Sequence, residues 1–167
     1  MGLPLFIAVV FPGLMALSAS MDFLTMTIPN PIPVVLTLVY FALAALYLPP
    51  QAILSDVSCG SLILLMGFAM FSAGWIGGGD AKLAAATTLW MGWSSVLDYG
   101  LAASICGGFL TLGLLAARAR PLPAILAEFP ALGRLHDPKS GVPYGIALAV
   151  AGLIEYPHTP IWTKLFS

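Results

Sequence analysis

Charged residues are scarce in this chain, and basic residues are absent from positions 1–81, which carry three acidic residues, Asp22, Asp56 and Asp80. Only 8% of the 167 residues are charged, whereas soluble domains carry about 25%. With 60% hydrophobic residues and a mean hydropathy of +1.00, the composition predicts one membrane-embedded domain over residues 1–167. The net charge of −1 leaves no basic surface for phosphates, which argues against nucleic-acid binding.

Cysteine and histidine are also rare. Cys59 and Cys106 do not form a CxxC pair, which excludes a zinc site of the usual spacing, and we expect no metal and no cofactor. Cys106 lies in an apolar run, where it is expected to be a small core residue. His136 and His158 are isolated from any Ser or Cys nucleophile at a spacing typical of a catalytic triad.

Long apolar runs dominate what remains, and they predict an all-α fold with a bundle of about six transmembrane helices. The first run is expected to be retained rather than cleaved as a signal peptide, because no basic side chain precedes it. The fourth is the weakest, since it contains Lys82 and Thr87-Thr88. We expect the spans near Leu3–Ala19, Ile32–Leu48, Leu62–Ile76, Ala81–Trp93, Leu101–Ala117 and Val142–Tyr156.

Basic residues indicate the orientation of such a bundle. Membrane proteins keep Lys and Arg in cytoplasmic loops, and with six spans all basic residues except Lys164 fall at junctions on one side. That side is therefore predicted to be cytoplasmic, with both termini outside. The residues concerned are Lys82, Arg118, Arg120, Arg134 and Lys139.

The longest of these cytoplasmic junctions is the Arg118–Ser140 loop. It is expected to contain a short interfacial helix around Ala124–Leu135. The apolar residues of that helix are expected to face the membrane, namely Ile125, Leu126, Phe129 and Leu132.

The acidic residues sort in the same way. Asp22 follows the first span and Asp80 the third, so both are expected on the cytoplasmic side, whereas Asp56, Asp98 and Glu155 are expected on the other. A carboxylate at membrane depth costs about 2.5–3.5 kcal/mol on insertion scales, so it usually has a functional reason. Two carboxyl groups that meet at this depth suggest an acid/base pair. The alternative is structural: Asp80 caps a helix that starts at Ala81, and Asp22 is a cap or an interfacial charge.

Three glycines precede Asp80. Gly77-Gly78-Gly79 permit unusual backbone angles and close approach of the helix that carries Asp22, and an exposed backbone edge there could pair with an extended peptide. Lys82 follows, either snorkelling to lipid headgroups or holding the potential that keeps one aspartate ionised.

Together these elements resemble the type IV prepilin peptidases, which are GxGD-type intramembrane aspartyl proteases. The resemblance rests on Asp22 followed by Ile28-Pro29-Asn30, on Gly77-Gly78-Gly79-Asp80-Ala81-Lys82, and on Val142-Pro143-Tyr144-Gly145. It implies a six-helix membrane bundle in which Asp22 and Asp80 are catalytic. The other positions implied to form the active-site loops and bind substrate are Gly77, Gly78, Gly79, Lys82, Pro29 and Asn30.

The resemblance further implies removal of a prepilin leader, after a glycine that precedes the pilin's hydrophobic helix, at the cytoplasmic face of the bacterial inner membrane. The long members carry a domain with paired CxxC motifs linked to methylation, which these residues do not contain. The chain is therefore most similar to the short peptidase-only branch associated with Flp pili of tight-adherence systems, and we expect no methyltransferase activity. Members often carry basic residues before Ile-Pro-Asn, but Phe23–Thr27 has none.

Two other classes of function stay open from the residues alone. A proton-coupled carrier could use the two aspartates as a relay, although carriers place such sites near the bilayer midplane between repeats. A structural subunit of a secretion machine would use them as caps. Within the protease class, an archaeal preflagellin peptidase or a presenilin-like protease is the alternative.

Overall fold

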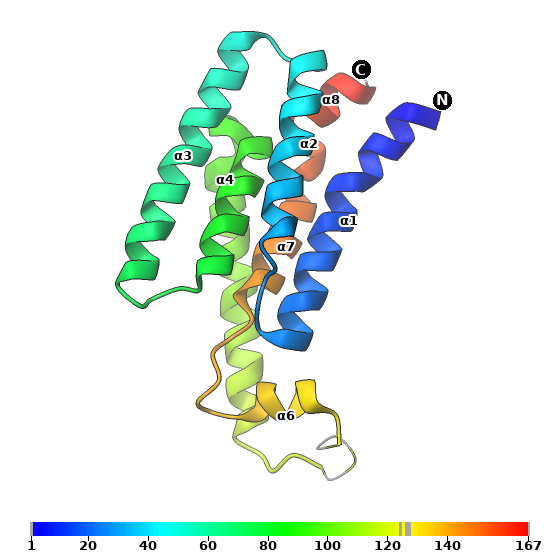
Figure 1. The fold of residues 1–167 in the computed structure, drawn as a ribbon. Helices are drawn as coiled ribbons and strands as arrows, with labels where there is room; N and C mark the ends of the chain where they lie inside the picture. The colour runs from blue at the N-terminus through cyan, green and yellow to red at the C-terminus, as the bar shows by residue number, and fades with distance from the viewer. Residues whose placement is uncertain (1, 124, 126–127, 167) are drawn as a thin grey trace.

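The chain folds into helices over the residues that this computed structural model describes, 2–123, 125 and 128–166. The all-α prediction is therefore confirmed (Figure 1). The elements are α1 (Gly2–Thr25), α2 (Pro31–Tyr47), α3 (Pro50–Ser72), α4 (Gly78–Arg118), α6 (Pro130–His136), α7 (Tyr144–Glu155), the 3-10 helix η1 (Tyr156–His158) and α8 (Pro160–Phe166).

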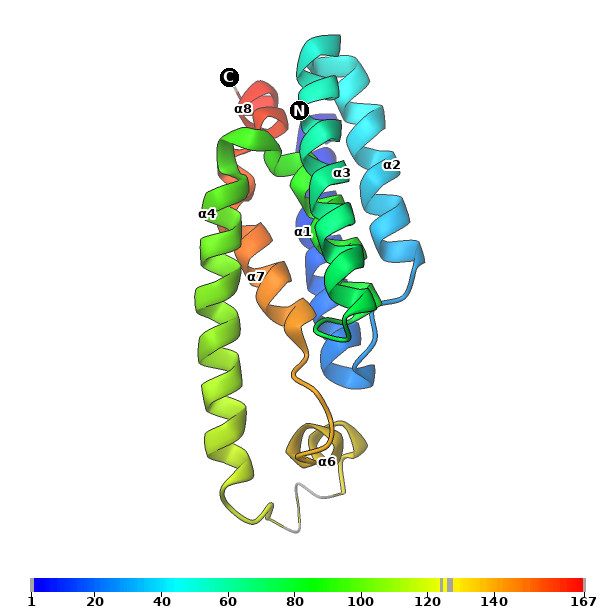
Figure 2. The same cartoon turned by 90° about the vertical axis from the view of Figure 1, so that its left-hand side faces the viewer.

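Three of these helices, α1, α3 and α4, are long and apolar enough to cross a membrane, and α2 is a shorter apolar helix. The chain runs back and forth along one axis, with both termini at one end of the bundle and α6 at the other (Figures 1 and 2). This arrangement is that of a polytopic membrane protein. It brings the end of α1, the start of α4 and the α4–α7 loop to the same end, as the count of spans predicts.

Helix α4 reverses direction at Gly92, so it supplies the fourth and fifth predicted spans without a connecting loop. Gly92 has φ 59° and ψ −173°, which no helix interior adopts. Before it, α4 runs antiparallel to α3, since Leu89 packs at Gly60 and Ala81 at Gly67. After it, α4 runs antiparallel to α7, whose first residue, Tyr144, packs at Gly107.

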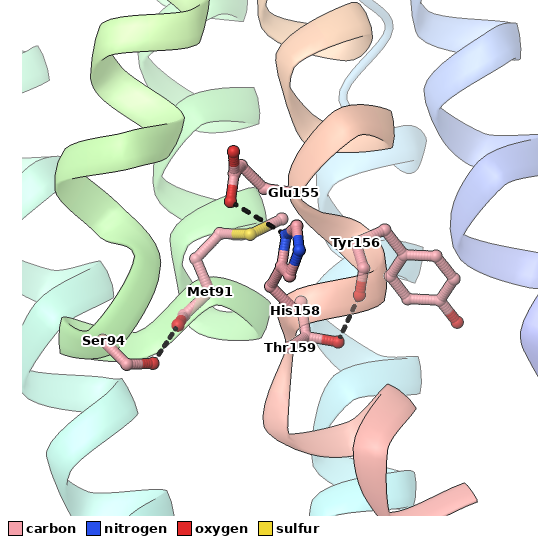
Figure 3. Close-up of polar contacts among 6 residues, drawn as sticks. All are labelled: Met91, Ser94, Glu155, Tyr156, His158 and Thr159. Carbon is pink, nitrogen blue, oxygen red and sulfur yellow. Dashed lines mark hydrogen bonds and ion pairs between the residues drawn. The ribbon is translucent and has the colours of Figure 1, made fainter. Parts of the chain in front are cut away.

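The reversal lies beside the end of α7 (Figure 3). Ser94 Oγ donates to the Met91 carbonyl at 3.2 Å. Across from it, His158 Nδ1 lies 3.4 Å from Glu155 Oε2, and Thr159 Oγ1 donates to the Tyr156 carbonyl at 2.8 Å. These hydroxyl groups therefore give hydrogen bonds to backbone carbonyls at the helix ends beside the reversal.

The first half of α4 occupies the centre of the bundle. Thr87 and Thr88, which weaken its hydropathy, are 0% and 1% exposed, so this span faces other helices rather than lipid. Trp90 is fully buried, with its ring centroid 5.0 Å from that of Phe11 and 6.0 Å from that of Tyr40. Helix contacts replace lipid contacts here, which explains why the most central span looks the least hydrophobic.

The predicted start of the third span was wrong. Helix α3 begins at Pro50 rather than near Leu62, so Asp56 lies inside a helix and not at a junction. Its side chain is 6% exposed, and its Oδ2 accepts a hydrogen bond of 2.7 Å from Tyr40 Oη. A donor on the neighbouring helix thus allows a carboxyl group to sit within a span.

The α4–α7 loop is held by two arginines. Arg118 Nε donates to the Leu135 carbonyl at 2.7 Å and its Nη2 to the Gly141 carbonyl at 2.9 Å. Arg134 donates to the Leu24 carbonyl, which fastens α6 to the end of α1. Within the described residues, the C-terminal part of the predicted interfacial helix forms α6, which begins at Pro130.

Other details of the prediction also change. Of the predicted interfacial helix, Ala124 and Leu126 lie outside the described residues. Cys106 is only partly buried, while Cys59 is the buried cysteine. The C-terminal helix α8 was not predicted.

Replacement of Gly92 by alanine is expected to destabilise the protein. A Cβ there would lie 2.4 Å from Asp56 Oδ1, and the backbone conformation itself costs about 1–3 kcal/mol for other residues. Gly100→Ala is the control, because nothing lies within 4 Å of its Cβ position and Ala favours a helix. Unfolding in mixed detergent micelles should show a loss of about 1–3 kcal/mol or more for Gly92→Ala only; equal stability of the two variants would contradict the strained reversal.

Candidate active site

Asp22 lies in the last turn of α1 and is 4% exposed. The helix ends after Thr25, where Met26 has φ 56° and donates its N–H to the Asp22 carbonyl at 2.8 Å. The Asp22 side chain accepts a hydrogen bond of 2.7 Å at Oδ2 from the Gly145 N–H. Gly145 is in the first turn of α7, so the carboxylate faces the positive end of that helix, which offsets part of the cost of burial.

Asp80 lies in the first turn of α4 and is partly buried. The expectation of a helix that starts at Ala81 with Asp80 as its cap was wrong, because α4 begins at Gly78 with Gly77 as N-cap. Gly78 and Gly79 are therefore helical and do not form an open backbone edge. A Cβ on Gly77 would lie 2.9 Å from Asp80 Oδ2, so the glycine leaves room for the carboxylate at the helix start.

The fold brings the two aspartates to one site. Asp22 and Ile28 both lie against Gly145, and Gly79, which precedes Asp80, also lies against Ile28. Ile28, from the α1–α2 turn, packs between the helices that carry the site: a Cβ on Gly79 would lie 3.1 Å from Ile28 Cβ, and one on Gly145 would lie 2.6 Å from Ile28 Cδ1. Glycine at both positions allows α4 and α7 to approach Ile28, and hence each other.

Lys82 and Asn30 form a second contact at this end. Lys82 Nζ donates to Asn30 Oδ1 at 2.9 Å, and both residues are exposed. This partner for Lys82 was not among those expected from the sequence. Pro29 supports the turn through its carbonyl, which accepts the Ile32 N–H at 3.1 Å. The contact links the start of α2 to the first turns of α4.

Three other acidic residues, Asp56, Asp98 and Glu155, do not join this site. Asp56 pairs with Tyr40 inside the bundle, and Asp98 and Glu155 line a separate cavity with His158. Among the residues that the structure describes, no three His, Cys, Asp or Glu side chains form a group that could hold a metal ion. The site therefore consists of two carboxyl groups, backbone donors and the Lys82–Asn30 contact.

A known family model covers the part of the chain that carries both aspartates. The model of the type IV leader peptidase family matches residues 9–112, which is more than half of the chain. The chain belongs to the type IV leader peptidase family. No curated protein and no solved structure matches it.

As a member of the type IV leader peptidase family, the protein is an aspartic prepilin peptidase, which is a membrane-embedded hydrolase. The matched residues include Asp22, Asp80 and the loops around them. They end before the Val142–Gly145 element, whose contribution to the site is visible only in the fold.

Two residues of the site have roles that the sequence did not indicate. Ile28 and Gly145 belong to the recognised motifs, but nothing in the pattern marks Ile28 as the packing residue between two helices or the Gly145 N–H as a donor to Asp22. A backbone donor leaves no signature in residue identity, and only the close contact explains why glycine stands at 145.

Gly145→Ala is expected to impair leader cleavage. The new Cβ would lie 2.8 Å from Asp22 Oδ2 and 2.6 Å from Ile28 Cδ1, so Asp22 has to move, and small misplacements of catalytic groups can cost about 100-fold. Gly141→Ala is the control, since nothing lies within 4 Å of its Cβ position. Cleavage rates of a prepilin by the two purified variants check this; normal activity of Gly145→Ala would refute the tight contact.

Proposed function

We propose that the protein removes the leader peptide of Flp-type prepilins at the cytoplasmic face of the bacterial inner membrane, with Asp22 and Asp80 as the catalytic pair. The observation that carries this proposal is their position at one end of the bundle, Asp22 in the last turn of α1 and Asp80 in the first turn of α4, on either side of Ile28. The peptidase is a single domain over residues 1–167.

The arrangement fits hydrolysis by a carboxyl pair. Two close carboxyl groups do not easily ionise together, so they share one proton. The ionised group takes a proton from a water molecule, whose oxygen attacks the scissile carbonyl, while the protonated group donates its proton to the carbonyl oxygen. As the tetrahedral intermediate collapses, the group that took the water proton gives it to the leaving nitrogen, and the other group takes back a proton from one hydroxyl of the intermediate. The C–N bond breaks, which releases the leader as a free acid and the pilin with a new amino terminus. Neither a covalent enzyme intermediate nor a metal takes part.

Support for the cytoplasmic orientation comes from charge. The end of the bundle that carries the aspartates also carries the α4–α7 loop with its arginines (Figure 1), and basic residues concentrate on the cytoplasmic side. Support for the Flp class comes from the resemblance of the chain to the short branch of the family.

Asp22→Asn and Asp80→Asn are each expected to abolish cleavage, because an amide neither accepts the proton of water nor shares one with its partner. We expect a loss of at least about 10²–10⁴-fold, the usual contribution of general acid–base catalysis. Co-expression with an Flp-type prepilin, with leader removal read on a gel, measures it. Asp98→Asn is the matched control, since Asp98 lines a cavity away from the pair; substantial cleavage by either aspartate variant would sink the catalytic assignment.

Cysteine labelling tests the orientation. Arg120 is exposed in the loop after α4, and Gln51 is exposed at the start of α3, near the opposite end. In a background without Cys59 and Cys106, a membrane-impermeant maleimide should label Gln51→Cys in spheroplasts and Arg120→Cys only after permeabilisation. The reverse pattern would place the aspartates outside the cell.

A further inference from the structure

A groove opens on the side of the bundle between α2 and α3. It has a volume of about 630 Å³, and the first half of α4 forms its floor. The floor is formed by Ala85, Ala86 and Leu89 of α4, with the small Gly60 of α3 beside them, while Leu38 and Leu64 line the walls. These two leucines are 62% and 47% exposed, so neither is covered by another part of the described chain.

The groove follows the axis of the bundle. Along α2 its lining extends from Asn30 to Phe41, which is about 16 Å at about 1.5 Å per helical residue. That distance is about half of the 30 Å hydrocarbon core of a bilayer. The groove is therefore long enough to hold several turns of a helix at membrane depth.

One end of the groove reaches the candidate active site. Asn30 and Lys82, which are joined by the 2.9 Å hydrogen bond, both line it at this end. Lys82 is two residues from Asp80 in the same helix. A helix lying in the groove thus has its end at Lys82, two residues along α4 from Asp80.

We infer that this groove is the docking site for the apolar helix of the prepilin, held between α2 and α3 on the small-residue floor of α4. The inference rests on the proposed function, in which the scissile bond precedes that helix and must reach Asp22 and Asp80. In lipid, apolar burial alone does not drive helices together, and small residues that allow close backbone approach do. The floor supplies such residues, and the open end supplies the path to the carboxyl pair.

A second cavity near Asp22 fits the helix less well. It measures about 360 Å³ and is lined by Ala19, Ser20, Phe23 and Leu24 of α1 together with Ile146. Its lining covers little more than one turn of α1, so it offers no axial seat for a helix that continues into the membrane.

Tryptophan substitutions at paired leucines test the groove. Leu38→Trp and Leu64→Trp place a large ring inside it, whereas Leu46→Trp and Leu65→Trp place the same ring on exposed positions of the same helices outside it. We expect kcat/KM for an Flp-type prepilin to fall by at least about tenfold in the first pair and to stay at the wild-type value in the second.

Photocrosslinking identifies the occupant. With Asp80→Asn to retain substrate, a benzophenone amino acid at position 38 or 64 should crosslink to the apolar helix of the prepilin, and one at position 46 or 65 should not. Crosslinks from the groove to lipid alone, or to the prepilin only from the control positions, would overturn the inference.

The two proposals fail in different ways. If the wild-type protein leaves the prepilin uncleaved, the proposed function fails and the docking site with it. If the wild type cleaves and the groove-filling variants cleave as fast as their controls, the groove alone is refuted.

Discussion

Close approach of three chain segments around Ile28 is the constraint on which the site depends. The side chain of Ile28 lies where Cβ atoms would otherwise stand at Gly79 and Gly145, so the starts of α4 and α7 both pack against the α1–α2 turn. Asp22 and Asp80 come from helix ends that this packing holds together. Gly145 also donates its N–H to Asp22, and this hydrogen bond forms only when the start of α7 lies close to the end of α1.

Much of this organisation could be predicted from the sequence, because the bilayer imposes simple rules. Apolar runs predict the spans, and counting spans places Asp22 and Asp80 at one end, where the fold has them. The rules fail where helices face one another instead of lipid. Thr87 and Thr88 made the central span look weak although they are buried. The predicted helix boundaries were wrong where a polar residue has a partner inside the bundle. Asp56 is the example, because its hydrogen bond with Tyr40, 16 positions away, allows it to lie within a helix.

The three acidic residues of the first 81 positions show that depth in the membrane does not by itself indicate catalysis. Asp56 accepts a hydrogen bond from the hydroxyl of Tyr40 and lies against the reversal at Gly92. Its contacts are therefore those of a structural residue that joins helices. Asp22 accepts a backbone N–H and has a second carboxyl group nearby. A neighbouring acid has no evident structural benefit and is typical of acid–base sites.

The reversal of α4 also affects how the protein enters the bilayer. A largely apolar stretch of 41 residues that turns back at Gly92 is a helical hairpin, not one long span. Its charged residues other than Asp98 lie near its two ends, with Asp80 and Lys82 at the first and Arg118 at the last. In the proposed orientation the hairpin can therefore insert as a unit, with both ends on the cytoplasmic side and only the turn translocated, so that Asp80 does not have to cross the hydrocarbon core.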